Sequence, residues 1–228
     1  MSIQFRPQYQ YLDQNKEVEE RIYEGETPGV SYGDIAERYY TVGQYMKEVK
    51  DVSKAMAAAG DSYICDEYLN AMGSPEAESV YVLHDLNNDG IEEFFIGLKF
   101  NYDIPYYVIY DVYTWKDGRA YQLMRGIGYR NGSCKICENG VIEDNYSGTA
   151  WDGQTLYHIL PEGGIELETI DSVSSRRDGT VQSYYHWNEL IDENSLQTIL
   201  EQYQPESVTY VDCNRETIEQ LRLSGIRK

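Results

Sequence analysis

Residues 80–96 of the 228-residue chain read VYVLHDLNNDGIEEFFI. Apolar residues dominate both ends of this stretch, and a polar run that contains Asn-Asp-Gly lies between them. Short apolar runs bounded by turn-forming residues predict strands, and glycine permits a sharp reversal between them. We therefore expect a strand at 80–84, a loop, and a second strand at 94–99.

From residue 80 to residue 187, apolar and polar residues alternate with a period of two, which is typical of strands. The links between the alternating segments contain Asp-Gly, Asn-Gly or Gly-Gly, the residues of tight hairpin turns. Links this short join antiparallel neighbours, because parallel neighbours need a long crossover. The pattern predicts an antiparallel meander of about eight or nine strands, with candidates at 80–84, 94–99, 106–114, 120–125, 133–137, 141–145, 155–160, 165–170 and 182–187.

Helices are expected on both sides of the meander. Asp34 and Glu37 have the spacing of a capping box, and apolar residues recur at helical spacing from Ile35 to Met56, before Gly60. Further helices are expected at 64–72, 193–203 and 215–223, with a last strand at 208–211. Residues 1–33 show no period and are expected to form a poorly ordered arm.

This order of elements predicts one α+β domain over residues 34–228, large enough to bury a core. It has an N-terminal amphipathic helix within a helical part at 34–73, and the β-meander at 80–187. A C-terminal helical and strand segment at 193–228 is expected to pack on the sheet.

The charge of the chain limits its partners. Acidic residues outnumber basic ones by 39 to 19, which gives a formal net charge of −20. Such a protein repels phosphate backbones and anionic lipids, so we expect neither nucleic-acid binding nor membrane insertion. No run approaches transmembrane length, and the first seven residues lack the apolar core of a signal peptide. We expect a soluble chain that is either intracellular or a trimmed mature form.

The loop after the first strand has the oxygen pattern of a calcium site. Its ligands at positions 1, 3, 5, 7 and 9 are Asp85, Asn87, Asp89, the carbonyl of Ile91, and Glu93. Position 12, where a helix–loop–helix calcium loop has a bidentate Glu, is Ile96, which rules out an ordinary EF-hand. The pattern favours weak, structural Ca²⁺ binding over its alternative, a metal-free Asn-Asp-Gly turn stabilised by bonds to the backbone.

The loop resembles the strand-flanked calcium loops of integrin-type FG-GAP repeats. More widely, residues 34–203 resemble an uncharacterised family of domains in secreted proteins and lipoproteins of gut Firmicutes. The resemblance rests on YVLHDL at 81–86 and YDVYTWKDG at 110–118, with ENGVI at 138–142 and SGTA at 147–150. It implies an extracellular or cell-surface origin and no established activity. The absence of a signal sequence from this chain departs from that expectation.

Tyrosine is unusually frequent, with 23 residues against 4 Phe. Tyrosine combines apolar area with a hydroxyl group, which suits both half-exposed sheets and surfaces that bind glycans or proteins. The densest aromatic cluster lies at residues 106–115, where Tyr107, Tyr113 and Trp115 are the candidate ligand-facing side chains. The alternative is a central strand that packs on both faces.

Catalytic motifs are not evident in the sequence. Cys134 and Cys137 form C-x-x-C, but residues three apart on a strand point to opposite faces and cannot share a metal or a bond. The three histidines have no metal-ligand spacing, and Asp111, Glu143 and Asp144 near strand ends are not distinguished from other acids. An enzyme with an unrecognised carboxylate pair is therefore the third-ranked hypothesis.

The first-ranked hypothesis is a non-enzymatic, calcium-stabilised binding or accessory domain for a glycan or protein. The second is an acidic cytosolic inhibitor or immunity-type protein for a basic partner, because complementary charge speeds association.

Overall fold

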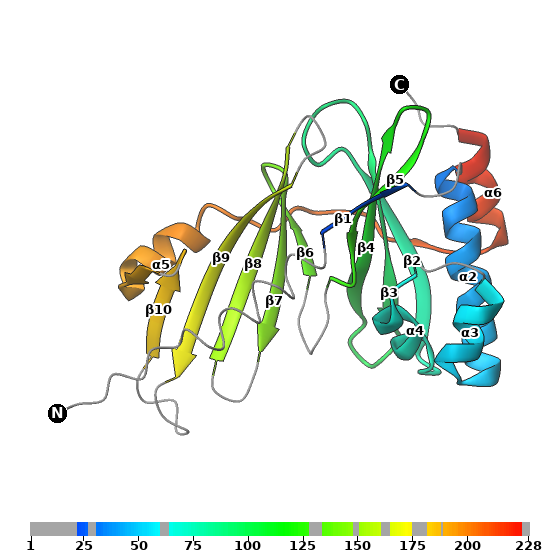
Figure 1. The fold of residues 1–228 in the computed structure, drawn as a ribbon, viewed down its shortest axis with the longest axis horizontal. Helices are drawn as coiled ribbons and strands as arrows, with labels where there is room; N and C mark the ends of the chain where they lie inside the picture. Colours follow the sequence, from blue (N-terminus) through cyan, green and yellow to red (C-terminus); the bar gives the residue numbers. More distant parts are fainter. Residues whose placement is uncertain are drawn as a thin grey trace.

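The computed structural model describes residues 22–26, 31–59, 64–127, 134–147, 151–160, 165–174, 182–187 and 189–224. The fold is α+β, as predicted, with helices and antiparallel sheets (Figure 1). The helices are α2 (Tyr32–Val49), α3 (Val52–Ala59), α4 (Asp66–Met72), α5 (Glu193–Leu200) and α6 (Arg215–Ser224). The strands are β1 (Ile22–Glu26), β2 (Ala77–His84), β3 (Glu93–Phe100), β4 (Tyr106–Lys116), β5 (Arg119–Arg125), β6 (Cys134–Cys137), β7 (Val141–Ser147), β8 (Trp151–Ile159), β9 (Ile165–Ser174), β10 (Gln182–His186), β11 (Glu189–Ile191) and β12 (Val211–Asp212).

The strands form two six-stranded sheets. Sheet A has the order β1-β5-β4-β3-β2-β12, and sheet B has the order β11-β10-β9-β8-β7-β6. Each of the nine predicted strands overlaps an observed one, and neighbouring strands in both sheets pair antiparallel. The meander divides between β5 and β6, so that the later strands pack across sheet A instead of extending it (Figure 1).

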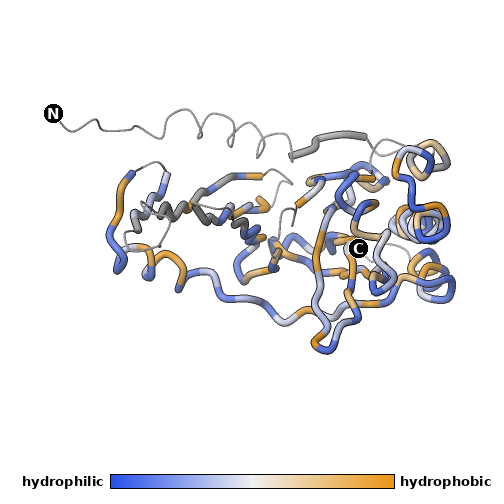
Figure 2. Tube along the Cα trace, turned by 90° about the horizontal axis from the view of Figure 1, so that it is seen from below, coloured by the Kyte–Doolittle hydropathy of each residue, from blue (hydrophilic) through white to orange (hydrophobic). Residues whose placement is uncertain are grey.

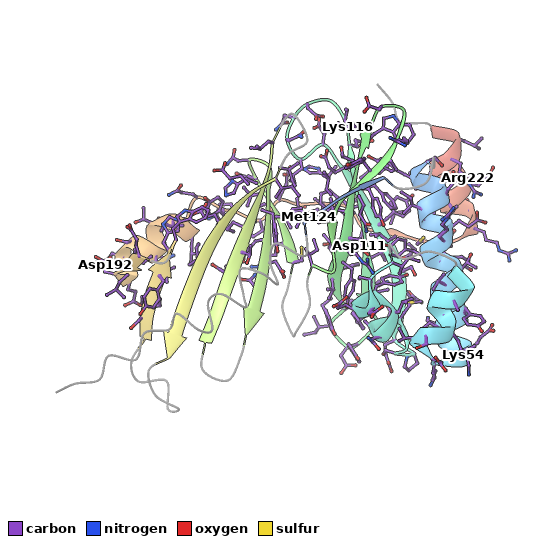
Figure 3. All side chains as sticks on the ribbon, viewed as in Figure 1. Lys54, Asp111, Lys116, Met124, Asp192 and Arg222 are labelled. Carbon is purple, nitrogen blue, oxygen red and sulfur yellow. The ribbon has the colours of Figure 1, made fainter. Side chains whose placement is uncertain are left out.

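Apolar side chains on both faces of sheet A explain this division. Phe94, for example, joins a cluster with residues of α2, α3, α4 and α6, whereas its neighbour Phe95 joins a cluster shared with sheet B. A sheet with two apolar faces must be covered on both. Helices cover one face and sheet B the other; Met124 lies between the two sheets (Figure 3). Burying a large apolar side chain contributes about 1.5–3 kcal/mol, so both interfaces are substantial.

Helix α5 covers the outer face of sheet B, where its apolar residues pack against Val141, Leu156 and Ile170. The chain then crosses from sheet B to the far edge of sheet A, where β12 pairs with β2 (Figure 1). Polar and apolar residues alternate along the helices, as expected for helices with one buried face (Figure 2). None of the described helices is long and apolar enough to cross a membrane.

The N-terminal region differs from the prediction in three ways. The expected arm at 1–33 includes β1, which pairs with β5, and the start of α2; residues 1–21 and 27–30 lie outside the described part. The N-cap is Ser31, which forms a capping box with Asp34, so the expected pair Asp34–Glu37 was wrong. The single long helix is broken at Lys50, whose left-handed φ of 51° ends α2 before α3 begins.

A β-bulge in sheet A redirects the side chains of β4. The register shifts between Ile96 and Gly97 of β3, and a Cβ on Gly97 would lie 2.1 Å from the carbonyl oxygen of Val108. Only glycine tolerates such a close backbone approach. Because of the extra residue, Tyr110 and Asp111 both face the helices.

Candidate functional site

The acidic loop between β2 and β3 is held by hydrogen bonds from its own backbone. The carboxylate of Asp85 accepts from the amides of Asp89 at 3.1 Å and Gly90 at 3.0 Å. The Asn87 Oδ1 accepts from the Asp89 amide at 3.2 Å, and Asp89 Oδ1 accepts from the Ile91 amide at 2.7 Å. These bonds turn the three side chains inward over the loop, as side-chain to backbone turns do.

Glu93 at the ninth position is fully buried. Its Oε2 accepts from the amide of Leu86 at 3.0 Å, and its Oε1 accepts from the hydroxyl of Thr114 at 3.1 Å. Burial raises the pKa of Glu93 to about 7, and the negative charges of Asp89 and Asp85 add to the increase, although the two hydrogen bonds oppose it. The carboxyl group therefore lies in an environment that favours either a proton or a cation.

The oxygen donors of the loop are of the class that calcium binds. Each carboxylate or amide oxygen has two lone pairs, so the oxygens of Asp85, Asn87 and Asp89 that accept one loop amide each keep a lone pair for a cation. The side chains are nevertheless not drawn around one point. Within the described ranges, no group of three or more His, Cys, Asp or Glu side chains is placed to hold a metal ion.

The same loop joins the layers of the molecule. The Asn87 Nδ2 donates to the carbonyl of Leu160 beyond β8 at 3.0 Å, and Leu86 is buried in the cluster between the sheets. A Cβ on Gly140, in the β6–β7 turn, would lie 3.4 Å from the carbonyl oxygen of Leu86. The hydroxyl of Tyr32 at the start of α2 donates to the carbonyl of Glu92 at 2.9 Å. The loop therefore contacts sheet A, sheet B and α2, so a substitution in it should affect the packing of all three.

The three predicted ligand-facing aromatics are not grouped on an open surface. Tyr113 is fully buried, and its hydroxyl lies 2.9 Å from that of Tyr39 on α2, so this prediction was wrong because the helices cover that face. Trp115 is partly buried and makes an edge contact with Tyr32. Tyr107 is half-buried and stacks on Tyr210, with ring centroids 4.0 Å apart.

An aromatic row lies instead at the β3–β4 hairpin, where the exposed Tyr102 and Tyr106 stack against the buried Phe100. The ring centroid of Tyr106 lies 4.8 Å from that of Phe100 and 5.9 Å from that of Tyr102. Both ring pairs are stacked. Tyr102 and Tyr106 are 50% and 47% exposed, and Ile104 between them is 82% exposed. Tyr102 was not predicted because loop residues have no periodicity; its only sequence signal is an aromatic residue in a short hairpin link.

The acids near strand ends are buried. Asp111 is fully buried, and it accepts from the hydroxyl of Tyr39 at 2.5 Å and the amide of Gly126 at 2.9 Å. Burial raises its pKa to about 6, although these bonds lower it. Glu143, 6% exposed, accepts from Asn145 at 2.5 Å and from Lys135 at 3.3 Å. These carboxylates accept hydrogen bonds from internal donors and do not face an open site.

Cys134 and Cys137 face opposite sides of sheet B, as predicted. Cys134 belongs to the cluster between the sheets and Cys137 to the cluster beneath α5. Burial raises the pKa of the Cys137 thiol to about 12 and that of Cys134 well above its ordinary value. A protonated, buried thiol is a poor nucleophile and a poor metal ligand.

Comparisons with known proteins assign no relative: no family model, curated protein or solved structure matches this chain.

Proposed function

We propose that this chain is a non-enzymatic binding domain, in which a calcium ion held by the loop Asp85–Glu93 stiffens the joint between the layers. The proposed ligand, a glycan or a protein, contacts the exposed Tyr102 and Tyr106 of the aromatic row. An extracellular or cell-surface location belongs to the same proposal, since weak calcium sites fill at extracellular calcium concentrations.

The observation that carries the calcium proposal is the electrostatics of Glu93. Burial raises the pKa of its carboxyl to about 7, and the like charges of Asp89 and Asp85 add to the increase. A divalent cation removes that repulsion and allows all three groups to ionise. The loop amides already orient the oxygens of Asp85 and Asp89, so ordering them costs little on binding.

The observation that supports a binding surface is the exposed aromatic row itself. Two stacked tyrosines with half of their area in water, beside the exposed Ile104, form an apolar surface with hydroxyl groups at its edge. Surfaces of this composition are enriched at interfaces, where aromatic side chains contribute most of the affinity.

The calcium proposal is tested by thermal unfolding in EDTA and at increasing calcium concentration. At about 100 times its dissociation constant, calcium should add about 2.7 kcal/mol to the free energy of unfolding. The variant Asp85→Ala with Asp89→Ala should lose this increase. The matched control, Glu78→Ala with Glu201→Ala, removes the same charge from exposed positions elsewhere and should keep it.

An absence of any shift at millimolar calcium would reject the metal and move the interpretation to the acidic inhibitor. The aromatic row is tested separately with Tyr102→Ser combined with Tyr106→Ser. This variant should keep the thermal stability of the wild type, because both rings are half exposed, and should lose binding to the ligand.

A further inference from the structure

A second polar cluster lies on the outer face of sheet B, away from the loop and the aromatic row. Glu168 on β9 accepts from Nε2 of His158 on β8 at 3.0 Å and from Nε2 of His186 on β10 at 2.6 Å. It also accepts from the hydroxyl of Tyr203, just after α5, at 2.6 Å. The fold thus brings together four elements around one carboxylate, which we name the Glu168 cluster.

Glu168 determines which nitrogen of each imidazole donates to it. Glu168 is 9% exposed, and burial alone would raise its pKa, but hydrogen bonds from His158, Tyr203 and His186 lower that pKa to about 2. An ionised carboxylate only accepts, so each imidazole must donate through Nε2. In the neutral ring that donates through Nε2, Nδ1 carries the lone pair and is an acceptor. The two side chains remain 27% and 26% exposed.

The residue after His186 is a strained, exposed tryptophan. Trp187 has a φ of 51°, is 49% exposed, and its ring lies 6.1 Å from that of His186. Bulky residues rarely adopt left-handed backbone, and a tight turn at this position ordinarily takes Asn or Gly. Strained backbone at such bulky residues clusters at ligand-contacting positions, although turns alone account for Lys50 and Asp117. The turn therefore holds an indole in water beside the Glu168 cluster.

We propose that Trp187, His186 and His158 form a binding site for a neutral saccharide. The indole offers an apolar face for the C–H face of a sugar ring, and the imidazole acceptors pair with sugar hydroxyl groups, which donate. An ionised carboxylate ligand donates nothing to such acceptors, and anionic ligands, phosphates included, are repelled by a net charge of −20. The site is independent of the calcium loop and of the aromatic row, so it goes beyond the function proposed above.

The test uses the full chain and an immobilised array of neutral oligosaccharides. The wild type should retain at least one of them, and Trp187→Asn should weaken that binding by about tenfold or more. Asparagine suits a left-handed turn, so the variant should unfold at the same or a higher temperature. Leu223→Ser, which removes a 78% exposed apolar side chain on α6, away from both proposed binding surfaces, should bind like the wild type. Binding should also be unchanged between about 0.05 and 0.5 M NaCl, because a neutral ligand is not screened.

Three results would overturn the inference. One is no retention of any neutral oligosaccharide by the wild type. Another is saccharide binding that persists in Trp187→Asn and is lost in Tyr102→Ser with Tyr106→Ser. The aromatic row would then be the binding surface. The third is binding that falls steeply with salt, which indicates a cationic ligand.

Discussion

The buried carboxyl of Glu93 should make the stability of the apo protein fall as the pH rises. Its pKa is raised from 4.5 to about 7 in the folded state. Between these values the folded state holds a proton that the unfolded state has lost, so stability decreases with pH. Integrating the two titrations gives a loss of roughly 2.5 kcal/mol between about pH 5 and pH 8 from this one group.

The variant Glu93→Gln tests this expectation, because the neutral amide has the same shape and keeps an oxygen for the amide of Leu86. Urea unfolding of both proteins in EDTA, at pH 5 and at pH 8, gives the free energy of unfolding at each pH. The two proteins should share one m-value, the slope of this free energy against urea concentration. The wild type should lose roughly 2.5 kcal/mol more than the variant across this range. Asp111, whose pKa is also raised, titrates equally in both proteins and cancels in the comparison.

The control is Glu92→Gln, which removes a neighbouring charge that is exposed. Its pH dependence should follow that of the wild type. Calcium should also stabilise the wild type more at pH 8 than at pH 5, since a proton and the ion compete for the same carboxyl. The reasoning is refuted if the free energy of unfolding changes between pH 5 and pH 8 by the same amount, within about 0.5 kcal/mol, in the wild type and in Glu93→Gln. The pKa of Glu93 is then not raised.

Three other contacts have measurable consequences. Tyr39→Phe removes a hydrogen bond that lowers the pKa of Asp111, so that pKa should rise above about 6 in a carboxyl NMR titration; an unchanged value contradicts the contact. Gly97→Ala places a methyl group against the carbonyl oxygen of Val108 on β4 and should lower the free energy of unfolding in urea by about 3 kcal/mol. A loss below about 1 kcal/mol shows that the backbones of β3 and β4 are not in close contact there. Asn87→Asp keeps an oxygen for calcium but loses the donor to Leu160, so hydrogen exchange in sheet B should speed up while calcium binding persists; unchanged exchange means that this bond does not join the sheets.

Strands β2 to β10 were predictable because their signals are local. Turn residues such as Asp117-Gly118 and Asn139-Gly140 adopt positive φ in the structure, as hairpin chemistry requires. The division into two sheets was not predictable from period alone. It depends on Phe94 and Phe95 both finding apolar partners, and a period of two does not say what covers each face. The break at Lys50 was hidden by an apolar spacing that continues through it.

The candidate sites likewise divide into those with a local sequence signal and those formed by residues far apart in the sequence. The acidic loop was visible because its oxygens lie within nine residues, and its side chains do bond to the loop amides. Tyr113 was misplaced because its burial depends on Tyr39, 74 residues earlier in the chain. The Glu168 cluster had no sequence signal, since its histidines are separated by 28 residues (158 to 186) and meet only across the strands of sheet B.

The position of the acidic loop explains why calcium would matter to a protein that already has a core. Leu86 is buried between the sheets, and the neighbouring Asn87 bonds to the end of β8, so the loop backbone belongs to both layers. The buried Glu93 makes this joint a place where ionisation costs stability between about pH 5 and pH 8. A proton relieves that cost only in acid, whereas the proposed calcium ion would relieve it at neutral pH. In the proposed function, the ion therefore stabilises the contact between the sheets under the conditions in which an extracellular binding domain works.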